Sequence, residues 1–102
     1  MVAQDPENHL RIKQVLEQPR AGEPVEVKGW VAAKSAIGGL VFATIRDGTG
    51  YIQVSAKGGV TPPESMAAIK GVTKESAVSV RGVVREDSRA PGGVEISVRE
   101  FP

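Results

Sequence analysis

Apolar and polar residues alternate with a period of two along most of the chain, and this pattern constrains the fold more than any other feature. In VEVKGWV, for example, Val25, Val27 and Val31 occupy every second position apart from Gly29. Such alternation is typical of a strand with one buried face. The same period recurs further along the chain, and it predicts strands over 25–34, 40–46, 51–55, 77–86 and 92–100.

Two segments have helical spacing instead. A first helix is predicted over 7–17, where four apolar residues share one side and Pro19 marks the end. A second helix is predicted over Glu64–Lys70, where Met66 and Ile69 are three residues apart behind two prolines. The chain therefore has one helix before the strands and one between the third and fourth strands.

Short glycine-rich segments connect the strands. SAIGG at 35–39 predicts a turn, and DGTG at 47–50 predicts a tight hairpin in which Asp47 has a turn role. The order β-β-β-α-β-β is that of an OB-fold, a five-stranded Greek-key barrel with little helix. We expect 1–22 to form the N-terminal helix and lead-in and 23–102 to form this all-β barrel. Its predicted interior contains Val27, Val41, Ile45, Ile52, Val54, Val80, Val94 and Ile96.

Charge and composition limit the kind of function. The 102 residues fit one domain, and 13 basic against 12 acidic residues give a net charge of +1. Binding of nucleic acid by phosphate contacts alone needs a stronger positive field, so shape and base contacts would have to contribute. The absence of cysteine excludes disulfides and thiolate metal sites and suits the cytoplasm. We expect no cofactor, no metal site and no membrane segment.

One aromatic side chain is predicted on the outer surface. If Val41 and Ile45 point inward, Phe42 points outward, and Gln53 lies on the same face of the next strand. A flat ring beside an amide suits single-stranded nucleic acid, because a base can stack on the ring while the amide reads its edge. Exposed aromatics also cover barrel mouths or form protein interfaces, so the pattern alone leaves these alternatives open.

Other conspicuous residues favour ordinary structural roles. His9 is a lone histidine without a second ligand at metal spacing. Trp30 is expected to cover one end of the barrel. Arg46, Arg81 and Arg89 are candidate phosphate contacts, but each is equally consistent with a solvated surface charge.

Four blocks of the chain resemble a known family. They are GWV at 29–31, GGLVFATIRDGTGYIQV at 38–54, KESAVSVRGVVRE at 74–86 and RAPGGVEI at 89–96. Together they resemble the N-terminal anticodon-binding OB domain of class IIb aminoacyl-tRNA synthetases, and the similarity is greatest to asparaginyl and archaeal-type aspartyl enzymes. The resemblance implies that Phe42 stacks on the central anticodon base and that Gln53 hydrogen-bonds the same uracil.

Some positions depart from the family pattern. Many members have a basic residue where this chain has Ser35, which leaves open whether Lys34 substitutes for it or the contact is absent. Discriminating aspartyl enzymes tend to have an aromatic and a basic residue where this chain has Ala32 and Pro91. The resemblance therefore favours an asparaginyl or nondiscriminating aspartyl type. The full set of candidate nucleic-acid-binding residues is Phe42, Gln53, Lys34, Ser35, Arg46, Arg89, Pro91 and Glu95.

We expect a binding module without catalysis of its own. The class II catalytic domain is much larger, and none of its motifs occurs in this chain. The implied partner is the anticodon stem-loop of tRNA(Asn) or tRNA(Asp). A nonspecific single-strand DNA binder, a protein-interaction domain and an OB scaffold for engineered binding remain as alternatives.

Overall fold

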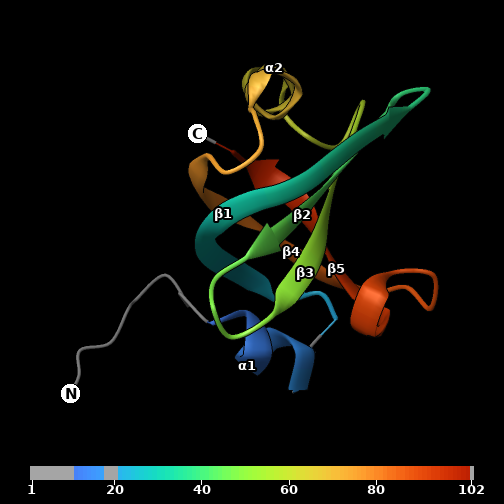
Figure 1. Ribbon diagram of the computed structural model, residues 1–102. Helices are drawn as coiled ribbons and strands as arrows, with labels where there is room; N and C mark the ends of the chain where they lie inside the picture. The colour runs from blue at the N-terminus through green and yellow to red at the C-terminus, as the bar shows by residue number, and fades with distance from the viewer. Residues whose placement is uncertain (1–10, 18–20, 102) are drawn as a thin grey trace.

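The computed structural model in Figure 1 describes residues 11–17 and 21–101. Its five strands close into a barrel in the order β1-β2-β3-β5-β4. β3 pairs with β5 in parallel, and the other neighbours are antiparallel. The five-stranded barrel predicted from the alternation is thereby confirmed. The strands are β1 (Pro24–Ile37), β2 (Leu40–Arg46), β3 (Tyr51–Lys57), β4 (Ala77–Glu86) and β5 (Val94–Glu100).

Two helices lie at opposite ends of the barrel, α1 (Ile12–Glu17) below and α2 (Pro63–Gly71) above in Figure 1. Each inserts apolar side chains into the core, Ile12 and Val15 from α1 and Ile69 from α2. The predicted second helix is confirmed. The predicted start of the first helix, together with His9 and Pro19, lies outside the described residues, and the division at residue 22 stays a prediction.

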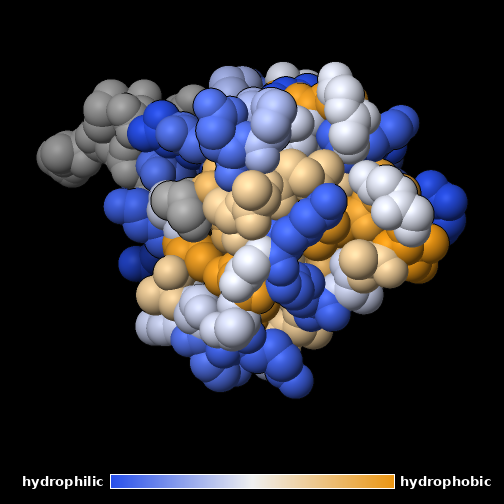
Figure 2. All heavy atoms as spheres, turned by 90° about the horizontal axis from the view of Figure 1, so that it is seen from above, coloured by the Kyte–Doolittle hydropathy of each residue, from blue (hydrophilic) through white to orange (hydrophobic). Residues whose placement is uncertain are grey.

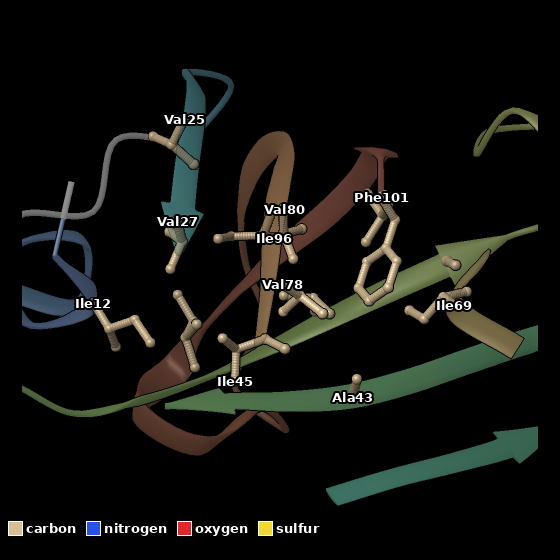
Figure 3. Close-up of a cluster of buried hydrophobic side chains, with 14 of the residues drawn as sticks. Ile12, Val25, Val27, Ala43, Ile45, Ile69, Val78, Val80, Ile96 and Phe101 are labelled. Carbon is tan, nitrogen blue, oxygen red and sulfur yellow. The ribbon is translucent and has the colours of Figure 1, made fainter. Parts of the chain in front are cut away.

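The barrel interior consists almost entirely of β-branched side chains. Figure 3 shows side chains from both helices and from several strands converging there, with Phe101 and Ile69 together near one end. Branched side chains pack well on a pleated surface, which explains their dominance in a barrel this small. Every residue of the predicted interior is at most 3% exposed: Val27, Val41, Ile45, Ile52, Val54, Val80, Val94 and Ile96.

β1 is longer than predicted and contains an irregularity. It pairs with β4 through its first half and with β2 through its second half, so it bends around the barrel. The register shifts between Val31 and Ala33, which leaves Ala32 as an extra residue. Beyond this bulge the strand continues to Ile37, where the sequence predicted a turn from residue 35.

Two glycines allow strands to approach closely. A Cβ atom at Gly29 would lie 2.2 Å from the carbonyl oxygen of Arg46, and one at Gly82 would lie 2.2 Å from that of Ser97. No side chain fits at such a distance, which explains why glycine occupies both positions.

β5 begins two residues later than predicted. The 3-10 turn η1 (Pro91–Gly93) precedes it, closed by hydrogen bonds from the Gly93 amide to the Ala90 carbonyl and from the Asp87 amide to the Gly93 carbonyl. This turn contacts β3 and lies at the side of the barrel in Figure 1.

The surface is mixed in polarity. Figure 2 views the barrel from above, where hydrophobic residues gather in the middle and hydrophilic residues surround them. Within the described residues, no group of three or more acidic or histidine side chains is arranged to hold a metal ion. None of the helices formed by these residues has the length and hydropathy needed to cross a bilayer.

Candidate nucleic-acid interface

The candidate site lies on the outer side of β2 and β3 and includes one residue from each of their neighbours, β1 and β5. We call it the β2–β3 face and define it by Ser35, Phe42, Gln53, Ser55 and Glu95. Phe42 is half-buried, whereas its neighbours Val41 and Ala43 are buried in the core. The predicted outward direction of Phe42 is therefore confirmed. Its neighbours in register are Ser35 on β1 and Ser55 on β3. These small side chains leave the ring as the main apolar group of this row.

Gln53 lies diagonally across from Phe42 and pairs in register with Thr44 on β2 and Glu95 on β5. Its Nε2 donates a hydrogen bond to Glu95 Oε1 at 2.8 Å. A carboxylate only accepts hydrogen bonds, so this contact fixes which end of the amide faces Glu95. No described residue donates to Gln53 Oε1, which leaves that oxygen available for a ligand.

Glu95 is a buried carboxylate on the outward side of β5, with 3% of its surface exposed. Besides Gln53, it accepts a hydrogen bond from Ser55 Oγ at 3.1 Å and lies 3.5 Å from Arg85 Nη1. A buried charge needs such partners to offset its lost hydration. The sequence analysis included Glu95 among the candidates without assigning it a role. In the structure its buried carboxylate accepts hydrogen bonds from the Gln53 and Ser55 side chains.

Lys34 is directed away from the β2–β3 face. Because the bulge at Ala32 reverses the alternation of β1, Lys34 pairs with the inward-facing Ala43, and Ser35 pairs with Phe42. The Lys34 ammonium donates to the carbonyl oxygens of Ile69, Lys70 and Val72 at 3.4, 2.6 and 2.7 Å. All three of its donors therefore serve the C-terminal end of α2, where a cation is favoured.

Arg46 and Trp30 form a pair on the outer wall. The Arg46 guanidinium lies 5.6 Å from the centre of the Trp30 ring and forms an ion pair with Glu75. Trp30 is 43% exposed and does not belong to the buried core. A side chain this exposed packs little against the core, so the prediction that Trp30 covers one end of the barrel is wrong.

The loop before β5 contains the remaining candidates. Arg89 donates to Asp87 Oδ1 at 3.2 Å, and its side chain is 88% exposed. Hydrogen bonds from Arg89 hold the pKa of the Asp87 carboxyl below its ordinary value, and Asp87 in turn raises the pKa of Arg89. Pro91 lies in η1. This loop is thus ordered by its own contacts, beside the β2–β3 face.

The DGTG turn has a second role that the sequence did not reveal. Asp47 Oδ2 accepts the amide of Ile12 at 2.9 Å, and Thr49 Oγ1 accepts that of Lys13 at 3.1 Å, so the turn caps the first residues of α1. Partial burial acts to raise the pKa of Asp47, but hydrogen bonds from Thr49, Ile12 and Gly50 outweigh it and lower the pKa. The contact joins segments 35 residues apart, which local patterns do not predict.

Together these contacts describe what the β2–β3 face can do. A partly exposed ring suits stacking, and a buried carboxylate holds the neighbouring amide in one orientation. Most of the nearby cations are already paired with carboxylates. The arrangement is suited to a planar, polar-edged ligand such as a base.

Comparison with known proteins gives the same picture. Residues 25–101 match the tRNA anti-codon family of OB-fold nucleic acid binding domains. Asparagine–tRNA ligase from Symbiobacterium thermophilum is 44% identical over 80 residues, covering 78% of this chain and 18% of the relative. Aspartate–tRNA(Asp/Asn) ligase from Methanosphaera stadtmanae is 42% identical over 76 residues, covering 74% and 17%. The chain thus spans about a fifth of the length of these curated relatives.

Solved structures agree. Asparaginyl-tRNA synthetase from Pyrococcus horikoshii, complexed with asparaginyl-adenylate, superposes with a TM-score of 0.82 at 34% identity, covering 91% of this chain and 21% of that one. OBody AM3L09, bound to hen egg-white lysozyme, has a TM-score of 0.72 at 28% identity, covering 79% and 80%. The match over residues 25–101 spans most of the barrel. The chain belongs to the tRNA anti-codon family of OB-fold nucleic acid binding domains.

Proposed function

We propose that the β2–β3 face binds the anticodon loop of a tRNA for asparagine or aspartate. In this proposal Phe42 stacks on the central base, and Gln53 recognises that base as uracil. The observation that carries it is the pair formed by a partly exposed Phe42 and a neighbouring amide fixed by Glu95 at 2.8 Å. Membership of the anti-codon family and the names of the relatives support the choice of tRNA.

The chemistry of uracil matches the fixed amide. With Nε2 directed at Glu95, Gln53 Oε1 can accept the N3–H of uracil, and the second Nε2 hydrogen can reach its O4. Cytosine has an acceptor at N3, so it would place two acceptors against each other. The amide is thus set to prefer uracil over cytosine.

The other candidates have smaller parts in this proposal. Ser35 is next to Phe42 in register and could contact the backbone of the bound loop. Arg89 and Pro91 lie in the loop before β5, near the position of a flanking base. Ala32 and Pro91 favour an asparaginyl or nondiscriminating aspartyl type, with the catalytic domain outside this chain. A tRNA partner would place the protein in the cytoplasm.

Direct binding tests the proposal. An anticodon stem-loop with the sequence GUU is titrated against stem-loops that differ only in the central base, with fluorescence anisotropy as the measurement. We expect the uracil loop to bind most tightly. Equal affinity for all four loops would contradict anticodon reading and would leave a sequence-tolerant single-strand binder.

A second candidate is protein binding through a comparable surface, and one finding favours it. OBody AM3L09, 28% identical to this chain, is bound to lysozyme rather than to nucleic acid. Binding to a protein partner would not require the stem-loop, so the stem-loop titration distinguishes the two candidate functions. An absence of RNA binding at low and moderate salt would favour the protein-binding candidate.

A further inference from the structure

Two aromatic residues and an arginine form a row across the outer surface, apart from the β2–β3 face. Trp30 on β1 pairs in register with Arg46 on β2, which pairs with Tyr51 on β3. Trp30 is 43% exposed and Tyr51 is 57% exposed. We call these three residues the Trp30 platform. Arg46 follows Phe42 by four residues, which corresponds to about 13 Å along a strand at ~3.3 Å per residue.

The Trp30 ring is held in place and remains accessible. The Arg46 guanidinium lies 5.6 Å from the ring centre and is itself fixed by Glu75. Trp30 also borders an open pocket of about 730 Å³, which Arg46 does not line. This volume is in the range of small-molecule sites, and a nucleobase is smaller than such ligands. The indole therefore offers surface for stacking on the side of the pocket.

The charges around this pocket favour an anionic ligand with an aromatic part. Arg11 and Lys28 line it together with Ala77 and Ser79. Lys28 is exposed and forms no ion pair with any residue that the structure describes. The carboxylate in the lining is that of Asp47, whose oxygens already accept hydrogen bonds from α1 and the DGTG turn. A phosphate could therefore approach Lys28 while a base lies against Trp30.

We propose that the Trp30 platform binds a second base of the same RNA, several nucleotides from the base on Phe42. The inference rests on the proposed function, because Trp30 is next in register to Arg46 on β2, the strand that also carries Phe42. OB-folds take roughly 4–16 nucleotides each, so a loop that places one base on Phe42 is long enough to reach the platform. Stacking there tolerates any base, because every base has a face that can lie on the indole ring. Lys28 supplies the contact to the backbone phosphate.

Trp30 is the single tryptophan of the chain, so it reports its own occupancy. The GUU stem-loop is titrated into the full chain while tryptophan emission and RNA anisotropy are both recorded. We expect emission to be quenched with the same midpoint as the anisotropy. A set of stem-loops, each with one abasic loop nucleotide, then locates the base. Quenching should be lost for one nucleotide other than the central one.

Variants distinguish stacking from an indirect effect. Trp30→Ala should weaken binding roughly 5- to 150-fold, the range for one base–aromatic stack. Trp30→Ala and the abasic substitution that abolishes quenching remove the same contact. The loss of binding free energy with both changes together should therefore be smaller than the sum of the two separate losses. Lys28→Ala should weaken binding and reduce the salt dependence by about one phosphate. Val60→Ala and Lys70→Ala serve as matched controls, since both residues are exposed and lie in or just before α2, at the end of the barrel opposite α1.

Several outcomes would overturn this inference. If the stem-loop binds by anisotropy but emission is unchanged and Trp30→Ala binds as tightly as the parent, the platform is not occupied by RNA. If Trp30→Ala lowers the melting temperature, its weaker binding could reflect unfolding, and Lys28→Ala becomes the test of the pocket. Unaltered RNA binding by Lys28→Ala would then reject the inference. If no stem-loop binds at all, the proposed function fails first and this inference fails with it.

Discussion

At the residue scale, the proposed function gives Phe42 and Gln53 different tasks. The ring presents a flat apolar surface, and every base has a face that can stack on it. The amide presents a donor and an acceptor, which only some base edges complement. Affinity should therefore depend on Phe42 for every sequence, whereas discrimination should depend on Gln53 and on whatever holds its orientation.

Phe42→Ala tests the stacking part. We expect a loss of roughly 1–3 kcal/mol in binding free energy for every central base, with the order of preference retained. Because Phe42 lies on the outer face, the melting temperature should change little, in contrast to Ile52→Ala in the core at roughly 2–5 kcal/mol. Anisotropy titrations and thermal melts of both variants give the comparison. A variant that unfolds but binds normally in its folded fraction would identify Phe42 as a packing residue.

Glu95→Gln tests how the amide is held. The replacement keeps the size of the side chain but supplies both a donor and an acceptor, so Gln53 can turn its amide either way. We expect the preference for uracil over cytosine to narrow, with weaker binding of the uracil loop and stronger binding of the cytosine loop. Ser55→Ala is the matched control, because Ser55 bonds Glu95 Oε2 and not the amide. An unchanged preference in Glu95→Gln would show that the contact does not position Gln53.

The sequence predicted the residues of the face better than their contacts. Phe42 and Gln53 follow from alternation, which is a local property of each strand. Gln53 and Glu95 are 42 positions apart, and their contact requires the parallel pairing of β3 with β5. The sequence left the role of Lys34 open, because the bulge at Ala32 reverses the alternation without any glycine or proline to signal it.

At the element scale, the strand patterns and the helix contacts differ in how far they could be predicted. The bounds of β2 and β4 agree with the predicted 40–46 and 77–86, because a clear period-two pattern ends in polar turns at those positions. β1 exceeds its prediction, since pairing with β2 extends it through SAI. The attachment of α1 depends on long-range hydrogen bonds to the DGTG turn, and no local sequence pattern predicts these bonds.

The α1 attachment makes stability depend on pH. The pKa of Asp47 is lowered in the folded chain, so the carboxylate stabilises the fold above the pKa of an unfolded aspartate, about 3.9. This contribution is lost as the pH falls through the lower, folded pKa. We expect Asp47→Asn to be less stable than the parent near neutral pH and the difference to narrow in acid. Denaturant unfolding of both chains between neutral and acid pH measures the difference in stability. A difference that does not change with pH would contradict the stabilising role assigned to the Asp47 carboxylate.

At the scale of the whole molecule, charge is nearly balanced and most cations near the face are already engaged. Arg46, Arg85 and Arg89 pair with carboxylates, and Lys34 is bound to α2. Few cations remain to neutralise phosphates, so under the proposed function shape and base contacts would supply much of the affinity. The net charge of +1 is consistent with this division.

The salt dependence of stem-loop binding measures how many phosphates are neutralised. We expect about two to four, which corresponds to a slope of roughly −1.4 to −2.8 in log affinity against log salt for a single strand. Titrations at several salt concentrations, with the GUU stem-loop, give the slope. A value corresponding to about eight phosphates would indicate a binder dominated by its backbone contacts.

The most direct measurement is the ratio of affinities for stem-loops with uracil and with cytosine at the central position, in the parent chain and in Gln53→Ala. The proposal predicts a clear preference for uracil in the parent. It also predicts that Gln53→Ala loses roughly 1–3 kcal/mol with uracil and much less with cytosine, so that the ratio approaches one. Equal affinities in the parent, or the same ratio in both proteins, would contradict the claim that this face reads the central anticodon base.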